Sequence, residues 1–377
     1  MLPERLPERI AGVLRGATRP VCAHVYDTTA LRVRAAEVKA ALPPSATLLY
    51  AMKANGHPSV VATLAGAADG IEVASGGELA LALAVGARRI AFSGPAKTPA
   101  ELLAAVAAGA TVNAESVLEL RRLTRAAAGR PVRVALRVNR PGAAPSGSHH
   151  MTGTATPFGI DEADLGAAVA AAADLDVVGF HLHAVSNSLD APGYAAFVRD
   201  AVSWSLERAA HHGIDLREVN VGGGFGIDYT GDARFELGAL DHLPDTPLVF
   251  ELGRYLAADA GWYAAEVLDL KRTHGRWFAV LRGGTHHFRL PAAWGYSHPF
   301  TVLPMPWDEP FDRPVVRDVA VDAVGELCTP RDVLTRGQPV TELRVGDVLV
   351  FARTGAYGWD ISHHEFLRHP YPQMLVI

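Results

Sequence analysis

The feature that most constrains the fold of this chain is an eightfold alternation of short apolar runs with helix-forming segments. Each run is rich in β-branched or other apolar residues, and Ala-, Leu- and Glu-rich spacers separate consecutive runs. Such alternation is typical of β-α units that build a parallel sheet. Eight parallel strands with outer helices close a (β/α)8 barrel, so the sequence predicts an α/β, TIM-like barrel. The runs occupy residues 47–53, 71–74, 90–93, 111–114, 132–139, 176–184, 218–222 and 248–252.

The pattern changes after Leu252. Pro- and Gly-rich loops now separate strand-like runs that show little helical periodicity, at residues 256–271, 277–283, 317–325 and 346–357. This pattern is typical of an all-β domain. An early strand-like run, residues 21–26, precedes the first barrel unit. We therefore expect a barrel over residues 30–255 and a C-terminal β-sandwich or β-barrel domain built from residues 1–29 and 256–377.

Composition excludes several classes of function. The 377 residues include 35 Lys and Arg against 40 Asp and Glu, a net charge of −5, and the basic residues are scattered, so nucleic acid is not an expected partner. No apolar run reaches the ~18 residues of a membrane span. The first nine residues hold acids and prolines where a signal peptide needs an apolar core. With only two cysteines, far apart, the chain is expected to be cytoplasmic.

Functional groups in such barrels lie at the carboxyl ends of the strands. Several of the predicted strands carry polar or charged residues at that end. These are Lys53 after the first strand, Glu72 and Ser75 at the second, Arg137 in the fifth, His181, His183 and Ser186 at the sixth, and Glu251, Gly253 and Arg254 at the eighth.

A glycine-rich loop, Gly222 to Gly226, follows the seventh predicted strand, and Gly253 and Arg254 follow the eighth. Backbone amides at this place in a barrel commonly hold a phosphate. Glycines in a strand-to-helix turn also occur for tight geometry alone. The position of the loop directly after the seventh strand favours the phosphate interpretation.

Lys53 ends an apolar strand, where its side chain is expected to face the barrel mouth. A lone lysine is normally a solvated surface group, but a partly desolvated one has a lowered pKa and can form a Schiff base. A phosphate site opposite such a lysine indicates pyridoxal phosphate, whose ring also needs a carboxylate at its nitrogen and a group to cover its face. Glu251 and His183 suit these two needs.

At this point a family resemblance becomes visible. Several ordered motifs together resemble the fold type III, or alanine racemase-fold, pyridoxal-phosphate enzymes, and within them the ornithine/diaminopimelate decarboxylase branch. They are Tyr50 to Asn55, Gly70 to Leu79, Gly222 to Gly226, Glu251 to Arg254, Gly325 to Asp332 and Gly355 to Tyr357.

The resemblance implies roles for individual residues. Lys53 would bond the cofactor covalently, Glu251 would keep its ring nitrogen protonated, and His183 would stack on its ring. Glu72 and Arg137 would lie near the imine and the ring hydroxyl. The cofactor would also be held by Ser186, Gly223, Gly224, Gly253, Arg254 and Tyr357, the last from the C-terminal motif.

The two cysteines are expected to differ. Cys328 lies in the second-domain motif and would donate a proton from the partner subunit of a homodimer, which makes it a catalytic residue beside Lys53 and His183. An isolated cysteine is more commonly a buried apolar thiol, and we assign that role to Cys22.

Departures from the family pattern bear on the substrate. Thr329 stands where related chains carry an acid after the cysteine, so a second free ammonium on the substrate would lack its charged partner. This change, with the segments 283–292 and 358–364, resembles the siderophore-pathway decarboxylases that act on citryl-diaminopropionate. His286, His287 and Arg289 would then bind citrate carboxylates, with Asp332 and Tyr357 completing the substrate site. Alternatively, His286 and His287 would form hydrogen bonds with the backbone of the β domain and would not contact the substrate.

The same residues leave several other functions to consider. Diaminopimelate or ornithine/lysine decarboxylation is the alternative within the enzyme class. Racemisation is disfavoured because alanine racemases place a tyrosine at the position of Cys328. A non-catalytic pyridoxal-phosphate-binding protein of this fold would lack the C-terminal β domain. No metal site is expected.

Overall fold

The computed structural model describes residues 6–142 and 145–377, and its contacts divide the chain into two compact units. The barrel unit comprises Leu31–Ile227 and Ala233–Leu256. The β unit comprises the described residues up to Ala30 together with Asp228–Asp232 and Ala257–Ile377. Residues 1–5 lie outside the described residues. They are part of the N-terminal segment whose acids and prolines disfavour a signal peptide. Within the described residues no helix is long and apolar enough to cross a membrane.

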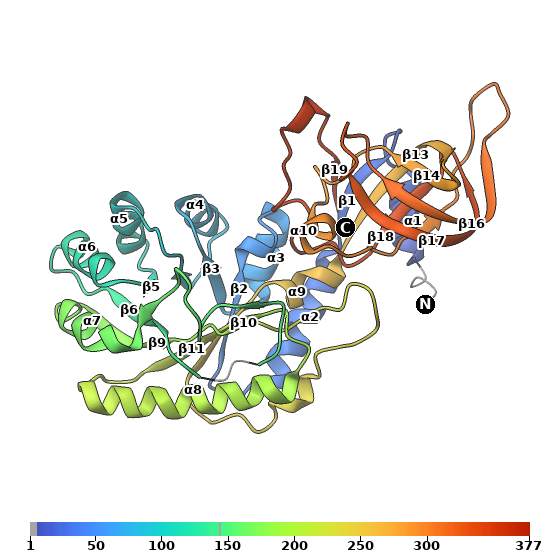
Figure 1. Cartoon of the computed structure of the whole chain (residues 1–377). Coiled ribbons are helices and arrows are strands. Elements are labelled where there is room, and N and C mark those ends of the chain that lie inside the picture. Colours follow the sequence, from blue (N-terminus) through green and yellow to red (C-terminus); the bar gives the residue numbers. More distant parts are fainter. Residues whose placement is uncertain (1–5, 143–144) are drawn as a thin grey trace. The chain divides into compact units, whose positions relative to one another are not determined.

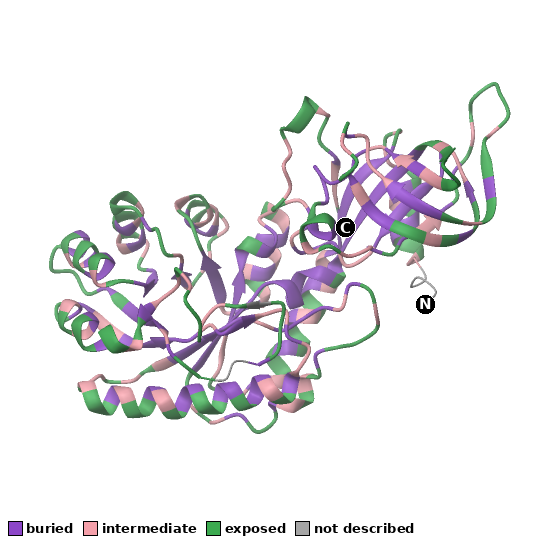
Figure 2. Cartoon of the chain, in the orientation of Figure 1, coloured by how far each residue is buried: buried purple, intermediate pink, exposed green. Residues whose placement is uncertain are grey.

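The barrel unit confirms the expected closed (β/α)8 architecture. Its parallel strands pair in the order β5-β4-β3-β2-β12-β11-β9-β6, and β5 also pairs with β6, which closes the sheet (Figure 1). The strands are mostly buried on both faces, as expected from their mostly apolar sequences (Figure 2). They are β2 (Thr47–Ala51), β3 (Gly70–Val73), β4 (Ile90–Phe92), β5 (Thr111–Ala114), β6 (Arg133–Asn139), β9 (Asp176–His181), β11 (Glu218–Gly222) and β12 (Leu248–Leu252).

Helices follow the strands and begin at local capping signals. At α5, Thr98 accepts from the backbone amide of Glu101 (3.3 Å), and the Glu101 carboxylate accepts from the backbone amide of Thr98 (2.8 Å), which forms a capping box. The helices are α2 (Thr28–Ala41), α3 (Pro58–Ala67), α4 (Gly76–Ala84), α5 (Pro99–Ala107), α6 (Val117–Ala127), α7 (Leu165–Ala171), α8 (Ala191–His212) and α9 (Arg254–Ala257), with the 3-10 turns η1 (Met52–Ala54), η2 (Glu162–Asp164) and η3 (Leu237–Leu240). Short strands β7 (His149–His150), β8 (Ile160–Asp161) and β10 (Val185–Ser186) lie in the connections.

The β unit is a mixed sheet in the order β15-β18-β13-β14-β16-β17, in which β1 pairs with both β13 and β19. Helix α1 (Glu8–Arg15) buries Ile10 and Leu14 in a core cluster with strand residues of this sheet. The strands are β1 (Cys22–Tyr26), β13 (Gly261–Thr273), β14 (Arg276–Leu281), β15 (Thr301–Leu303), β16 (Val315–Val324), β17 (Val333–Arg344), β18 (Val348–Phe351) and β19 (Gln373–Val376), with α10 (Leu290–Trp294), η4 (Ala258–Ala260) and η5 (Phe366–Arg368).

Several details differ from the sequence expectations. Residues 228–232, inside the expected barrel range, pack with the β unit because the Arg353 guanidinium donates to the carbonyls of Asp228 and Gly231. Strand β17 was not among the expected strands. It contains Gly337 and Pro339, two residues that weaken a strand signal, and its pairing with β16 supplies the missing stabilisation.

Candidate active site

Lys53 lies in the η1 turn directly after β2, at the mouth of the barrel. Its Nζ is 3.1 Å from Oε2 and 3.3 Å from Oε1 of Glu72, which stands on the neighbouring strand β3. The Glu72 side chain is fully buried, whereas that of Lys53 is 46% exposed. The amine is thus oriented by a buried carboxylate and remains open to a ligand.

Glu251, on β12, is a buried carboxylate held by three partners. Its Oε1 accepts from the side-chain amides of Asn220 (2.7 Å) and Asn113 (3.0 Å), and its Oε2 lies 3.3 Å from Nε2 of His181. Burial by itself raises the pKa of Glu251, but His181, Lys53 and the bond from Asn220 outweigh it and hold the pKa well below its ordinary value. Glu251 is therefore ionised at neutral pH.

His183 is held as a neutral ring. Burial, with the positive charges of Arg137 and Lys53, lowers the pKa of His183 well below its ordinary value. Its Nδ1 accepts from the backbone amide of Gly223 (3.2 Å), so the single ring proton lies on Nε2. A Cβ at Gly222, whose φ is +68°, would lie 2.4 Å from this Nδ1, so glycine is required for the ring to take its place.

The glycine loop continues this close packing at Gly224. Its φ is +134°, and a Cβ there would come within 2.9 Å of the Tyr194 ring. Among the described residues, the backbone amide of Gly224 has no hydrogen-bond acceptor. Gly253, after β12, packs against the turn that carries Lys53, since a Cβ there would lie 2.8 Å from the Cβ of Ala54. The two loops and Lys53 therefore face one small space.

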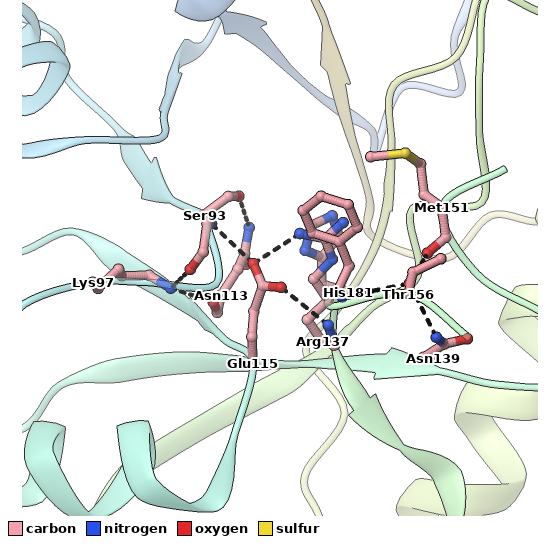
Figure 3. Close-up of polar contacts among 12 residues, drawn as sticks. Ser93, Lys97, Asn113, Glu115, Arg137, Asn139, Met151, Thr156 and His181 are labelled. Atoms are coloured by element: carbon pink, nitrogen blue, oxygen red, sulfur yellow. Dashed lines mark hydrogen bonds and ion pairs between the residues drawn. The ribbon is translucent and has the colours of Figure 1, made fainter. Parts of the chain in front are cut away.

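Arg137, on β6, is clamped from two sides (Figure 3). Its Nη1 donates to Glu115 at 2.8 Å, and its guanidinium lies 4.9 Å from the centre of the Phe158 ring. Glu115 also accepts from the backbone amides of Gly94 (2.9 Å) and Gly159 (3.0 Å). The Nε of Arg137 is buried and has no hydrogen-bond partner among the described residues. This orphaned donor is aimed by the clamp and needs an acceptor from outside the chain.

A second buried layer supports these groups. The Nζ of Lys97 donates to the carbonyls of Gly94 (2.7 Å) and Asn113 (3.0 Å) and pairs with Glu119 (2.6 Å). Burial raises the pKa of Glu119 even though Lys97 lowers it. The layer fixes the ends of β4 and β5, and therefore the positions from which Asn113 and Glu115 act.

The residues of the barrel mouth fit pyridoxal phosphate. An amine at Lys53 suits its aldehyde, an ionised buried carboxylate at Glu251 suits its ring nitrogen, and the unsatisfied donors at Gly224 and Arg137 need anionic or oxygen acceptors. Ser186 and Arg254 lie in the adjoining segments, half-buried and buried respectively. Each partner that this cofactor requires is present in the barrel unit.

The other residues expected in the site belong to the β unit. Cys328 is exposed, and Tyr357 is half-buried with a φ of +54°. Asp332 is buried, and its two carboxylate oxygens accept from the backbone amides of Thr285 (2.7 Å) and Leu327 (2.9 Å). Asp332 therefore holds the loop that carries Cys328, and its expected contact with the substrate stays a prediction.

The expected trio His286, His287 and Arg289 is not brought together as one surface. Both histidine rings are fully buried, 3.8 Å apart between centres, while Arg289 is exposed and lines a cavity. Burial lowers the pKa of His287 to about 2, with His286 adding to the effect. Both rings are thus buried in the β unit, and the expected contact of His286, His287 and Arg289 with citrate carboxylates stays a prediction.

Cys22 is buried in β1, as expected for a packing thiol. Its Sγ lies 3.3 Å from Nδ1 of His287 and 3.6 Å from Oη of Tyr263. Burial raises the pKa of the Cys22 thiol to about 12, which leaves it protonated and unreactive.

Sequence reasoning missed the residues that orient the expected ones. Asn113, Glu115 and Asn220 stand at the carboxyl ends of β5 and β11. The rule that singled out Glu251 applies equally to these positions. An amide or acid at such a strand end, within an otherwise apolar run, was the available signal.

Comparison with known proteins identifies the family. Residues 29–258 match the model described as "Pyridoxal-dependent decarboxylase, pyridoxal binding domain". The chain therefore belongs to the pyridoxal-phosphate-dependent decarboxylases, and it is an enzyme of that class.

Similar proteins come from several bacteria. A 2-[(L-alanin-3-ylcarbamoyl)methyl]-2-hydroxybutanedioate decarboxylase of Staphylococcus aureus is 37% identical over 99% of this chain and 98% of its own length. A diaminopimelate decarboxylase of Deinococcus radiodurans is 34% identical over 93% of this chain and 88% of its own. The crystal structure of the diaminopimelate decarboxylase of Helicobacter pylori complexed with L-lysine matches with a TM-score of 0.83 at 26% identity, covering 96% of this chain and 92% of that one.

Proposed function

We propose that this enzyme decarboxylates an amino acid that is joined to a carboxylate-rich group, of the citryl-diaminopropionate type, in siderophore biosynthesis. The observation that carries the proposal is the 37% identity, end to end, with the Staphylococcus aureus decarboxylase. The name of that relative describes an alanine linked through a carbamoylmethyl group to 2-hydroxybutanedioate. Such a substrate presents one amino acid end and two further carboxylates.

The residues of the barrel mouth divide the work of the reaction. Lys53 supplies the amine that holds the cofactor, and Arg137, Ser186, Gly223, Gly224, Gly253 and Arg254 supply further contacts, with Tyr357 of the β unit. Bound pyridoxal phosphate withdraws electrons from the α-carbon of an amino acid, so that its carboxylate can leave as carbon dioxide. Glu251 presents a permanent negative charge to the ring nitrogen because its pKa is held low. Neutral His183 covers the ring without adding a charge.

Cys328 is the proposed source of the proton that replaces the lost carboxylate at the α-carbon. Its side chain is exposed in the single chain, as a residue must be if it serves a second subunit. Asp332 keeps the Cys328 loop in shape through its two backbone bonds. We accordingly propose a cytoplasmic homodimer with shared active sites and a small-molecule substrate.

Diaminopimelate decarboxylation is the second candidate. The identity with the Deinococcus radiodurans enzyme, 34% over 93% of this chain, favours it. A diamino substrate needs an acid near its distal ammonium. Thr329 follows Cys328 here and offers only a hydroxyl, which supports the first candidate.

The test is to incubate the purified holoenzyme separately with citryl-diaminopropionate, diaminopimelate, ornithine and lysine, following carbon dioxide release and product mass. Turnover of the citryl conjugate alone is expected. Turnover of diaminopimelate alone would show that the siderophore assignment is wrong. Lys53→Ala should abolish the visible absorbance of the bound cofactor, whereas Lys39→Ala, a surface lysine paired with Asp69, should retain it.

A further inference from the structure

A cavity of about 760 Å³ lies within the β unit, in the size range of small-molecule sites. Its walls come from four separate parts of this unit. They are the segment from Thr285 to Ser297, the loop after Cys328 with residues Thr329 to Arg331, the start of β17, and His363 near the end of the chain. The proposed function leaves this cavity unassigned.

Cationic side chains dominate the cavity. Arg289, Arg331 and Arg336 line it together with His363, and none of the described residues that line it is acidic. Within residues 6–142 and 145–377, no carboxylate forms an ion pair with any of these three arginines. Arg289, Arg331 and Arg336 are exposed, and they bring three guanidinium groups to one concave space without a paired carboxylate among the described residues, so an anionic ligand would be stabilised there.

His363 adds a second, independent sign of a missing ligand. Its Nδ1 is buried and has no hydrogen-bond partner among the described residues. Burial lowers the pKa of His363, and the charge of Arg289 lowers it further, so the two groups lie within electrostatic reach of each other. A ligand oxygen would satisfy the ring nitrogen and offset the arginine charge together.

The cavity is tied to the proposed catalytic loop by the chain itself. Thr329, the residue after Cys328, lines the cavity, and so does Arg331 two residues further on. The loop is rigid because Asp332 accepts from Leu327 (2.9 Å) and the Asp332 amide donates to the Thr329 carbonyl (3.2 Å). Arg331 is three residues from Cys328 in this loop. A ligand bound to Arg331 is therefore held in a fixed position relative to the Cys328 thiol.

We propose that this cavity is the subsite for the distal carboxylates of the substrate, with Arg289, Arg331, Arg336 and His363 as its specificity-determining residues. The inference rests on the proposed function and assigns the binding of the distal carboxylates to this cavity. A polycarboxylate finds several guanidinium groups that can each bind a carboxylate in bidentate fashion. A distal ammonium meets only like charges, so diamino acids such as lysine, ornithine and diaminopimelate are selected against.

Two measurements on the cofactor-loaded enzyme test the subsite. Isothermal titration calorimetry with citrate measures binding of the distal group alone, and steady-state kinetics with citryl-diaminopropionate measures its use in turnover. The double variant Arg331→Gln/Arg336→Gln should weaken citrate binding by roughly ten- to a hundredfold and raise KM by a similar factor, with kcat changed far less. Arg272→Gln, an exposed arginine on β13 that does not line the cavity, is the matched control and should leave both values unchanged.

The outcomes separate the subsite from the proposed function. If the citryl conjugate is turned over and the double variant keeps the wild-type KM and citrate affinity, the subsite is overturned and the function stands. If the conjugate is not turned over but citrate binds and the double variant loses it, the anion subsite stands and the substrate assignment falls. Retained cofactor absorbance and circular dichroism in the double variant establish that either loss is local.

Discussion

Because His298 is buried, we expect the free energy of unfolding of the β unit to decrease as the pH falls. The ring is buried, with its Nε2 2.7 Å from the Ala352 carbonyl and its Nδ1 3.0 Å from the Tyr296 hydroxyl. A carbonyl only accepts, so Nε2 carries the proton and Nδ1 accepts from the hydroxyl. A second ring proton would break the bond from Tyr296, and burial lowers the pKa of His298 to about 4.

The sign and size of the effect follow from that value. Above pH 6.5 the ring is neutral in both the folded and unfolded states, and its bonds contribute fully. As the pH falls from 6.5 to about 4, only the unfolded chain binds the proton, so the free energy of unfolding decreases. The loss is about 1.4 kcal/mol for each pH unit, or roughly 2 kcal/mol between pH 6.5 and 5.

The perturbation is His298→Gln, which cannot titrate and retains a donor for the Ala352 carbonyl. At pH 7 the variant should be about 1–2 kcal/mol less stable than the wild type because the Tyr296 hydroxyl loses its acceptor. At pH 5 this difference in the free energy of unfolding should shrink to near zero. Only the wild type has the titrating ring, so only its free energy of unfolding decreases between pH 7 and pH 5. Contributions from other titrating groups cancel in the difference between the two proteins.

Urea unfolding followed by tryptophan fluorescence is the assay. Trp262, Trp277, Trp294, Trp307 and Trp359 belong to the β unit, and of the six tryptophans only Trp204 belongs to the barrel unit. The signal thus reports mainly the unit that contains His298. An equal stability difference at pH 7 and pH 5 would refute the assigned ring protonation.

Three further substitutions test the barrel mouth and the thiol. Gly222→Ala should weaken cofactor binding at least about tenfold by displacing the His183 ring, whereas Gly109→Ala, with a φ of +64° and no atom within 4 Å, has a similar backbone cost of about 1–2 kcal/mol and should bind normally. Glu251→Gln should lower kcat by about 10- to 1,000-fold with the fold retained, and unchanged kcat would contradict its charge role. Cys328→Ala should lower turnover by about 100-fold or more with cofactor absorbance intact. Unchanged turnover would remove Cys328 from proton donation.

The barrel was predictable because its strands are short, mostly apolar runs that alternate with helix-forming segments. A strand such as β12 is buried on both faces, so its residues carry the signal without help from distant parts of the chain. The same regularity placed Lys53 and Glu251 at strand ends, where barrel chemistry occurs. The supporting amides of Asn113 and Asn220 were not predicted, because a polar residue in a strand reveals its partner only when strand order and register are known.

The β unit shows the opposite case. Several of its strands pair over long sequence separations, as β1 does with β13 and β19, and the local sequence does not show that His286 and His287 are buried. The local sequence contains two adjacent histidines and an arginine. This pattern is equally consistent with a ligand site and with histidines that only bond the backbone of the β domain. The cationic cavity was hidden for the same reason, since Arg289, Arg331 and Arg336 meet only after the sheet has formed.

Strand β1 is inserted between β13 and β19, and it forms its bonds with residues from the far end of the chain. The Ile377 amide donates to the Tyr26 carbonyl (2.9 Å), and the Thr28 amide donates to the Ile377 carbonyl (2.9 Å). During synthesis on the ribosome, β1 therefore emerges first and waits unpaired while the whole barrel is made. An unpaired, apolar strand edge is a site of unwanted association. Newly made chains should thus be prone to aggregation from the release of β1 until β13 and β19 have paired with it.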